Sequence, residues 1–173
     1  MSYIKVAMTL LGQMLRDYRA ADAPAVNRVA LAAFKQFRDA YADWPAMAAT
    51  VGNMAALAGA GEIVVAERDG AVVGAVAYIP PHRPKARYFE ESWPIIRMLV
   101  VDPAQRGKGV GRALTDDCVR RAGRDGATVI ALHTSPIMTV ALSMYRRMGF
   151  ERLRDAPPIY GVPYAVYVKT LAV

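Results

Sequence analysis

The alternation of apolar and polar positions predicts helices and strands that follow one another along the chain. From residue 23 to about Phe37, apolar residues recur every three or four positions, which indicates a helix with one buried face. Ile95 to Val101 is a short run of mostly branched apolar residues, which is typical of a buried strand. By the same rules we predict helices at residues 23–37, 45–58, 110–122 and 136–148, and strands at 15–18, 63–67, 72–79, 95–101, 128–132, 150–154 and 165–170.

Residues with special backbone preferences mark the ends of these elements. Asp22 is expected to cap the first helix, and Thr134 or Ser135 the last, because short oxygen-bearing side chains accept hydrogen bonds from free helical N–H groups. Asp69-Gly70 lies between two strand patterns and is typical of a tight hairpin turn. The prolines and glycine of residues 157–163 indicate a loop between the last two strands.

This order of elements indicates a single α/β domain built around one mixed sheet. A chain of 173 residues with no internal repeat or linker is long enough for one substantial core. Hydrophobic residues make up 54% of the sequence, which argues against disorder. Residues 1–14 are expected to be an extension ahead of the domain or an extra helix.

The sequence favours a cytoplasmic protein. Lys5, Gln13 and the lack of a small-residue cleavage site argue against a signal peptide, and no apolar run is long enough to span a membrane. We therefore expect no membrane association. The single cysteine, Cys118, excludes an internal disulfide and suits a reducing compartment, and its helical position predicts a small buried hydrophobe rather than a catalytic thiol.

Three alternating glycines join the apolar run 95–101 to a helix that begins near Val110. Gly107, Gly109 and Gly111 allow the backbone to approach a ligand closely, and the free N–H groups at a helix start favour an anion. We therefore predict that this segment, residues 102–112 and here called the glycine loop, binds phosphate. Its spacing fits neither a Walker loop nor a dinucleotide fingerprint. A glycine-rich turn without a ligand is the alternative.

The formal net charge is +7, and the basic residues are clustered rather than evenly spread. Some surround the glycine loop, where a polyanionic cofactor would explain them. Others follow it on the predicted helix, where a solvated helix face explains them equally well. No recognition motif accompanies the charge, so we expect no nucleic-acid partner. The first group is Arg106, Lys108 and Arg112, and the second is Arg120, Arg121 and Arg124.

The glycine loop resembles the acyl-CoA pyrophosphate loop of the GCN5-related N-acetyltransferase (GNAT) superfamily. Arg106, Gly109 and Gly111 match its Arg/Gln-x-x-Gly-x-Gly/Ala signature, after a Val-Asp-Pro lead-in. Residues 141–150 resemble the family's second signature, an Ala and a Tyr four apart followed by Gly-Phe. The cofactor-binding residues that the resemblance implies are Leu99, Val101, Arg106, Gly107, Lys108, Gly109, Gly111 and Arg112.

The same resemblance covers roughly residues 15–170 and implies a fold and a co-substrate. The expected fold is a GNAT-like α/β domain over residues 1–173, with a mixed, mostly antiparallel central sheet of about 6–7 strands flanked by about four helices. Acetyl-CoA is the expected co-substrate and no metal is expected. A homodimer follows by analogy with the family alone.

The second signature assigns Tyr145 the role of protonating the thiolate that leaves CoA. A phenol of pKa near 10 can donate a proton to a thiolate whose acid has a pKa of about 8.5. Without the resemblance, Tyr145 would be read as a core residue, because it shares a helical stripe with Leu142 and Met148. In the family, a bulge late in the fourth strand also frees backbone N–H groups for the pantetheine arm, at positions occupied here by Leu99 and Val101.

Two positions depart from the family pattern. Met138 stands where many members have Asn, and Ile95 stands where many have a Glu that acts as a base or holds a water. The general base is therefore unassigned, with Glu90 and Glu91 as candidates a few residues earlier. His133 at the end of a strand is a less favoured candidate.

These observations predict an N-acetyltransferase that acts on a small-molecule or peptide primary amine. The alternative is a non-catalytic acyl-CoA-binding or sensing domain, which would keep the glycine loop but not need Tyr145. The acceptor is not fixed by any motif. A cationic amine could meet an acidic and aromatic pocket, although helix ends and ordinary packing explain the same residues; they are Asp39, Tyr41, Asp43, Trp44 and Tyr160.

Overall fold

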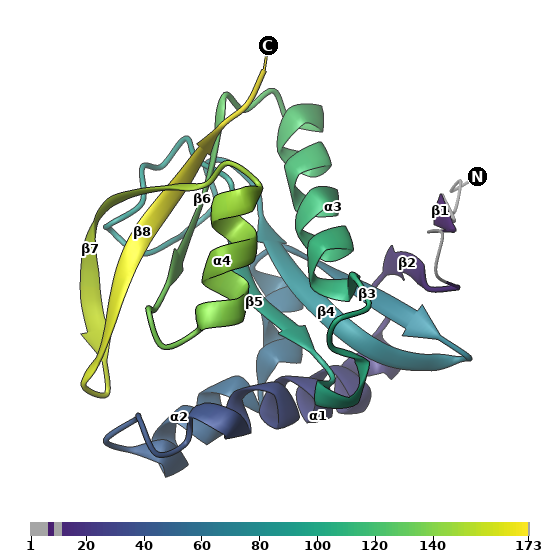
Figure 1. The fold of residues 1–173 in the computed structure, drawn as a ribbon. Helices are drawn as coiled ribbons and strands as arrows, with labels where there is room; N and C mark the ends of the chain where they lie inside the picture. Colours follow the sequence, from purple (N-terminus) through teal and green to yellow (C-terminus); the bar gives the residue numbers. More distant parts are fainter. Residues whose placement is uncertain (1–6, 9–11, 173) are drawn as a thin grey trace.

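The computed structural model describes residues 7–8 and 12–172, and it confirms the predicted α/β fold around one mixed sheet. Eight strands lie in the order β1-β2-β3-β4-β5-β6-β8-β7, and every neighbouring pair is antiparallel except β5 and β6 (Figure 1). One more strand than expected is present if the two-residue β1 is counted. The strands are β1 (Ala7–Met8), β2 (Met14–Asp17), β3 (Glu62–Arg68), β4 (Ala71–Ile79), β5 (Ile95–Val101), β6 (Val129–Thr134), β7 (Glu151–Ile159) and β8 (Val162–Thr170).

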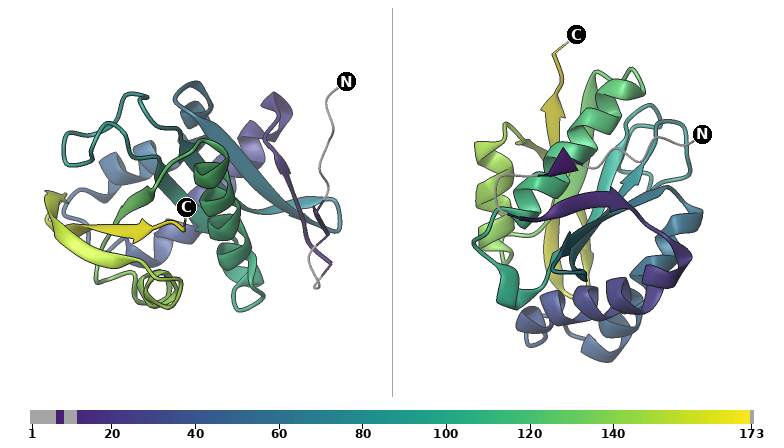
Figure 2. Two further views of the ribbon diagram at one scale, coloured as in Figure 1. Left: turned by 90° about the horizontal axis from the view of Figure 1, so that it is seen from above. Right: turned by 90° about the vertical axis from the view of Figure 1, so that its right-hand side faces the viewer.

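Two pairs of helices cover the two faces of the sheet, as Figures 1 and 2 show. The helices α1 (Ala23–Phe34) and α2 (Trp44–Val51) pack on one face, and α3 (Val110–Arg124) and α4 (Thr139–Arg147) on the other. The sheet separates two apolar cores, because alternate residues of a strand point to opposite faces. In β3, Ile63 and Val65 join the first core and Val64 joins the second. Within the described residues, no helix has the length and apolar character needed to cross a membrane.

Asp22 does not cap α1 as predicted, although it occupies the N-cap position. Its carboxylate accepts two hydrogen bonds from the Arg16 guanidinium, each 2.8 Å, and one from the backbone N–H of Arg19. These bonds, led by those from Arg16, lower the pKa of Asp22. The Asp22 carboxylate therefore binds Arg16 on β2 instead of accepting from the free N–H groups of α1. Asp43, in contrast, caps α2 by accepting from the N–H of Ala46.

The predicted start of the last helix is wrong. The helix α4 begins at Thr139 with Met138 at its N-cap, so Pro136 lies before it. Ser135 uses its hydroxyl to accept a 3.4 Å hydrogen bond from the N–H of Ile137, which closes a turn rather than a helix. The predicted cap residues, Thr134 and Ser135, thus lie about one helical turn before the start of α4.

The last two strands are longer than predicted, and the expected loop at 157–163 is mostly strand. The strands β7 and β8 meet in a tight turn at Tyr160 and Gly161, whose φ angles are 43° and 80°. Pro157 and Pro158 are tolerated because β7 is the edge of the sheet, where a missing N–H costs no ladder hydrogen bond on the open side.

A bulge and a divergence of strands shape the middle of the sheet. Ala75 pairs with Val100 and Ala77 with Arg97, so two residues of β5, Met98 and Leu99, lie opposite one residue of β4. Met98 has a φ of 58°. On the other side, β5 pairs with β6 only at Ile95. Beyond that residue the two parallel strands part, and the second half of β5 presents backbone groups that no neighbouring strand on that side occupies.

Candidate active site

The glycine loop forms an open helix start at the end of β5. Gly107 and Gly109 have φ angles of 74° and 78°, which glycine adopts at little cost, and Gly109 is the N-cap of α3. No side chain of the described residues caps this helix. The loop is fastened by Asp102, whose N–H donates to the Val73 carbonyl at 2.8 Å. The first N–H groups of α3 can therefore serve an anion.

Gly111 faces the space between the end of β5 and α4. A Cβ added there would lie 3.6 Å from Val101, 3.7 Å from the Met144 sulfur and 3.8 Å from Leu99. These are ordinary contact distances, so the protein itself does not require glycine at this position. Leu99 also lines the large cavity described below, which places the glycine loop and the cavity next to each other.

The basic side chains of the glycine loop are exposed and only lightly engaged. Arg106 donates to the Gln36 side chain at 3.3 Å, and Lys108 donates to the Gln105 side chain at 3.2 Å. Arg112 lies 3.9 Å from Asp116. Exposed contacts of this kind contribute little free energy, so the three side chains can turn toward a bound anion at small cost.

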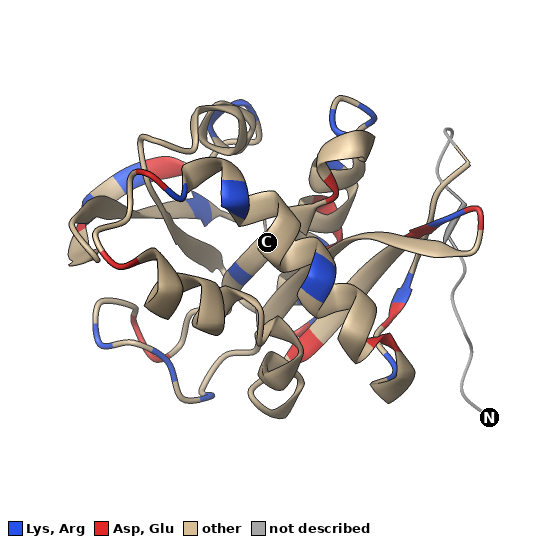
Figure 3. Ribbon diagram, turned by 90° about the horizontal axis from the view of Figure 1, so that it is seen from below, with Lys and Arg blue, Asp and Glu red and all other residues tan. Residues whose placement is uncertain are grey.

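The second basic group lies at the other end of α3 and is structural. Arg121 is only 16% exposed and contacts Asp17 at 2.7 Å, Glu62 at 2.5 Å and Asp117 at 2.7 Å. Arg124 pairs with Glu62 and Asp125, and Arg120 pairs with Asp117. Figure 3 shows Lys and Arg positions interspersed with Asp and Glu positions over several elements. Arg121 and Arg124 join α3 to β2 and β3, whereas the ion pair of Arg120 lies within α3.

A cavity of about 780 Å³ is lined by β5, β6 and α4 around the point where the two parallel strands part. Helices α1 and α2, the 84–89 loop and the β7–β8 hairpin also line it, so it extends to the opposite face of the sheet from α3. Most of the lining is apolar or aromatic. No Asp or Glu of the described residues lines it.

Tyr145 lines this cavity from α4. Its side chain is 5% exposed and packs edge to face against Phe150, with ring centroids 5.6 Å apart. Burial raises its pKa, so the phenol keeps its proton. None of the described residues forms a hydrogen bond with its hydroxyl, which is therefore available to a molecule in the cavity.

Glu90 and Glu91, the candidate bases, do not line the cavity. The exposed side chain of Glu90 pairs with Arg154 at 3.2 Å. Glu91 lies in the 80–93 loop, where its carbonyl accepts from the N–H of His82 at 2.9 Å. The structure does not bring either carboxylate to Tyr145, and their assignment as bases stays a prediction. Nor do the described residues hold a cluster of three or more His, Cys, Asp or Glu that could bind a metal.

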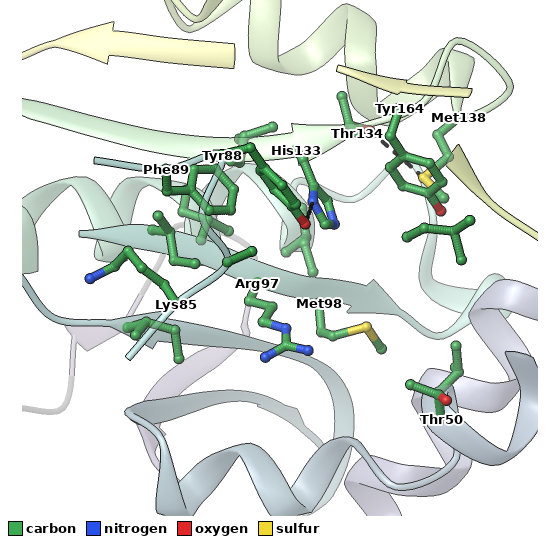
Figure 4. A pocket seen from close by; sticks show the side chains of 18 of the residues that line it. Thr50, Lys85, Tyr88, Phe89, Arg97, Met98, His133, Thr134, Met138 and Tyr164 are labelled. Atoms are coloured by element: carbon green, nitrogen blue, oxygen red, sulfur yellow. Dashed lines mark hydrogen bonds between the residues drawn. The ribbon is translucent and has the colours of Figure 1, made fainter. Parts of the chain in front are cut away.

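His133, Tyr88 and Tyr164 line the cavity as an aromatic cluster (Figure 4), and Tyr41 lies behind Tyr164 as its hydrogen-bond partner. The Tyr88 hydroxyl lies 2.7 Å from His133 Nδ1, and the Tyr41 and Tyr164 hydroxyls lie 2.5 Å apart. The His133 ring stacks on Phe89 and meets Tyr164 edge on. Burial, and then the charge of Arg97, lowers the pKa of His133 to about 4, so its imidazole is neutral at pH 7.

The acidic and aromatic acceptor pocket considered above is not present. Asp39 is 98% exposed beside Arg38, and Asp43 is engaged as the cap of α2. Trp44 packs near Tyr41, with ring centroids 6.4 Å apart, and Tyr160 lines the cavity without an acidic neighbour in that lining. Helix ends and ordinary packing account for the two aspartates.

Comparison with known proteins agrees with the family and the fold. The model of the acetyltransferase (GNAT) family matches residues 20–150. A Corynebacterium glutamicum structure, described as histone acetyltransferase HPA2 and related acetyltransferase, is 25% identical with a TM-score of 0.72, covering 94% of this chain and 98% of that one. A Brucella melitensis GNAT acetyltransferase, solved in complex with acetyl-CoA, shares the fold at 24% identity with a TM-score of 0.65, covering 94% and 90%.

Curated relatives are similar over part of their length. N-acetyltransferase family 8 member 3 of Rattus norvegicus is 31% identical over 106 residues, which are 55% of this chain and 45% of the relative. Mycothiol acetyltransferase of Cellulomonas flavigena is 35% identical over 105 residues, which are 59% of this chain and 30% of the relative. The chain thus matches less than half the length of each. Because the family model spans more than half of this sequence, the chain belongs to the GNAT family.

Proposed function

We propose that this chain is an N-acetyltransferase that transfers the acetyl group of acetyl-CoA to a primary amine. The observation that carries the proposal is the continuity of three features: the open start of α3, the bulged end of β5 and the cavity that holds Tyr145. Leu99 lines the cavity and also lies beside Gly111, so the anion site and the aromatic cavity share one wall.

Each part of the site suits one part of acetyl-CoA. The N–H groups of α3 and the side chains of Arg106, Lys108 and Arg112 would hold the pyrophosphate. The unpaired backbone of β5 around Leu99 and Val101 would bind the amides of the pantetheine arm. The Brucella protein with acetyl-CoA bound supports this assignment, because the fold is shared.

The chemistry needs a neutral amine and a proton for the leaving sulfur. Acetyl-CoA supplies a thioester whose carbonyl carbon forms a bond to the amine nitrogen as the C–S bond breaks. Tyr145 donates its phenolic proton to the departing thiolate, and the proton that the amine loses restores the phenol through solvent. Holding amine and thioester together supplies much of the acceleration, so a strong protein base is not required.

A thiol-release assay tests the proposal on the full chain. Acetyl-CoA is incubated with a panel of amines, amino acids, polyamines, aminoglycosides and peptides, and free CoA thiol is measured with a chromogenic disulfide. Cys118 is fully buried, so the protein's own thiol contributes little background. We expect turnover with at least one acceptor and its loss in Gly109→Trp, which fills the glycine loop.

The alternative, a non-catalytic acyl-CoA-binding domain, gives a different result. Acetyl-CoA would then bind in calorimetry, but no acceptor would raise thiol release above the rate of hydrolysis without protein. A folded Gly109→Trp variant that binds acetyl-CoA as tightly as the wild type would contradict the cofactor site itself.

A further inference from the structure

Two long basic side chains line the cavity, Lys85 and Arg97. Lys85 is occupied: its ammonium donates to the backbone carbonyls of Arg83 at 2.7 Å, Glu91 at 3.3 Å and Pro80 at 3.4 Å. Arg97 forms no hydrogen bond or ion pair with any of the described residues. The cavity lining therefore includes one guanidinium whose five N–H donors are unused. No Asp or Glu of the described residues lines the cavity to pair with it.

Strand alternation in β5 places Arg97 at the cavity, where its side chain lines the wall and stays exposed. Ile95 belongs to the core on the α1 and α2 face and Ile96 to the opposite core, as strand alternation requires. The extra residue at the bulge then places Met98 on the α1 and α2 face as well, so two consecutive side chains point the same way. Figure 4 shows Arg97 and Met98 side by side below the strand, facing the helices.

Arg97 lies within electrostatic range of the aromatic cluster. Burial, and then the charge of Arg97, lowers the pKa of His133; for Tyr88, burial raises the pKa and the charge of Arg97 partly offsets that rise. An anion bound to the guanidinium would cancel the contribution of Arg97 and so raise the pKa of each group. The remaining lining, on the same side of the sheet, is apolar, with Phe34, Met47 and Val51 from α1 and α2.

We propose that the acceptor is a small amino acid with an apolar side chain, whose carboxylate binds Arg97 while its amine faces the thioester. The planar guanidinium matches a carboxylate in a two-bond geometry that Lys or a neutral donor does not offer. The apolar residues of α1 and α2 take up the side chain. The role of this amino acid as acetyl acceptor rests on the proposed function. The binding of its carboxylate to Arg97 does not depend on turnover.

Direct binding tests the inference separately from catalysis. N-acetyl-leucine and its amide, which differ only in the carboxylate, are titrated into the full chain in the presence of CoA and followed by calorimetry. We expect the acid to bind about 10- to 100-fold more tightly than the amide, the range of a charge-assisted hydrogen-bonded pair. The Arg97→Met variant should lose this difference and keep its affinity for acetyl-CoA.

Arg87→Met provides the matched control, because Arg87 lies on the neighbouring loop and lines a separate, smaller pocket. It should keep the preference for the acid. A nuclear magnetic resonance titration adds a second readout: the acid should raise the pKa of His133 above about 4, with His82 as the internal reference. Equal binding of acid and amide to the wild type, or a preference that survives in Arg97→Met, overturns the inference.

Turnover separates this inference from the proposed function. If the acid binds with the expected preference but no amine is acetylated, the carboxylate site stands and the enzymatic function fails. If leucine, leucinamide and isopentylamine are acetylated equally well, the enzyme stands and the amino-acid assignment is wrong. A cationic diamine that outcompetes leucine at the wild type also overturns it.

Discussion

The Tyr88 hydroxyl and His133 Nδ1 lie 2.7 Å apart and join the 80–93 loop to the end of β6. Because His133 is largely enclosed by Phe89, Tyr88 and Tyr164, its imidazole cannot be charged without losing hydration. The neutral ring fixes the loop against the sheet and leaves a polar edge toward the cavity. Protonation of His133 therefore opposes the folded state.

The stability of the protein should fall as the pH is lowered from about 6.5 to about 4. The pKa of His133 is about 4 in the folded chain, against an ordinary value of 6.5, so the unfolded chain binds the proton first in this window. The full contribution, about 3 kcal/mol, is present above pH 6.5 and is lost as the pH approaches 4. Urea unfolding at a series of pH values measures it.

His133→Asn removes the titrating ring while keeping a polar partner for Tyr88, and it should flatten the stability profile in this window. His82→Asn changes the other histidine of the chain, in the exposed part of the loop, and should leave the slope as in the wild type. If the two variants show the same slope as the wild type, the low pKa of His133 is not the cause.

Tyr145→Phe should lower kcat on the order of 10²-fold, the low end for a general acid, because a thiolate is a good leaving group. The contact with Phe150 is retained, so the Tm should change little. Burial raises the pKa of Tyr145, and the phenol should stay protonated to beyond pH 10; the wild-type rate should show no alkaline fall from this group. Steady-state rates from pH 6 to 9.5 measure both effects. An unchanged kcat with every acceptor would show that Tyr145 is a packing residue.

Much of the fold could be predicted because its signals are local. The apolar run of β5, the Asp69-Gly70 turn and the glycine loop are each specified within a few residues, and each is present in the structure. The length of β7 could not be predicted, because Pro157 and Pro158 are typical of loops unless the strand is known to be an edge. Sheet order is a long-range property of the chain.

The chemistry of the cavity was less predictable than the glycine loop. His133, Tyr88, Tyr164 and Tyr41 come from four segments that the sequence separates widely, and no periodicity links them. Met98 could not be placed either, because the bulge there breaks the alternation that puts Arg97 on the same face as Ile95. Glu90 and Glu91 were close in sequence to the expected base position, but the loop turns their side chains to solvent.

Gly111→Ala should separate stability from co-substrate binding. The new methyl group would make only ordinary contacts with Val101, Leu99 and Met144, and alanine favours the helix by up to about 1 kcal/mol. The same methyl group lies on the wall beside the bulged strand, so affinity for acetyl-CoA should fall about tenfold or more. Gly123→Ala, near the other end of α3 with nothing within 4 Å of the new Cβ, should gain stability without this loss. Equal acetyl-CoA affinity in the two variants would place the ligand elsewhere.

The two arginine groups of α3 should respond differently to the loss of one charge. Arg121→Met removes a largely buried guanidinium from Asp17, Glu62 and Asp117; Glu62 and Asp117 each keep one other arginine, so the unfolding free energy should fall by about 2 kcal/mol.

Arg120→Met is the matched control on the exposed side of the same helix, and it should cost less than about 1 kcal/mol. Acetyl-CoA affinity, measured by calorimetry on the folded proteins, should be unchanged in both variants, whereas Arg106→Met should weaken it and leave unfolding by urea nearly unaltered. A folded Arg121→Met protein with reduced acetyl-CoA affinity would show that the cofactor site extends along α3 to its C-terminal end. That result would contradict the assignment of Arg121 to the contact between α3 and the sheet.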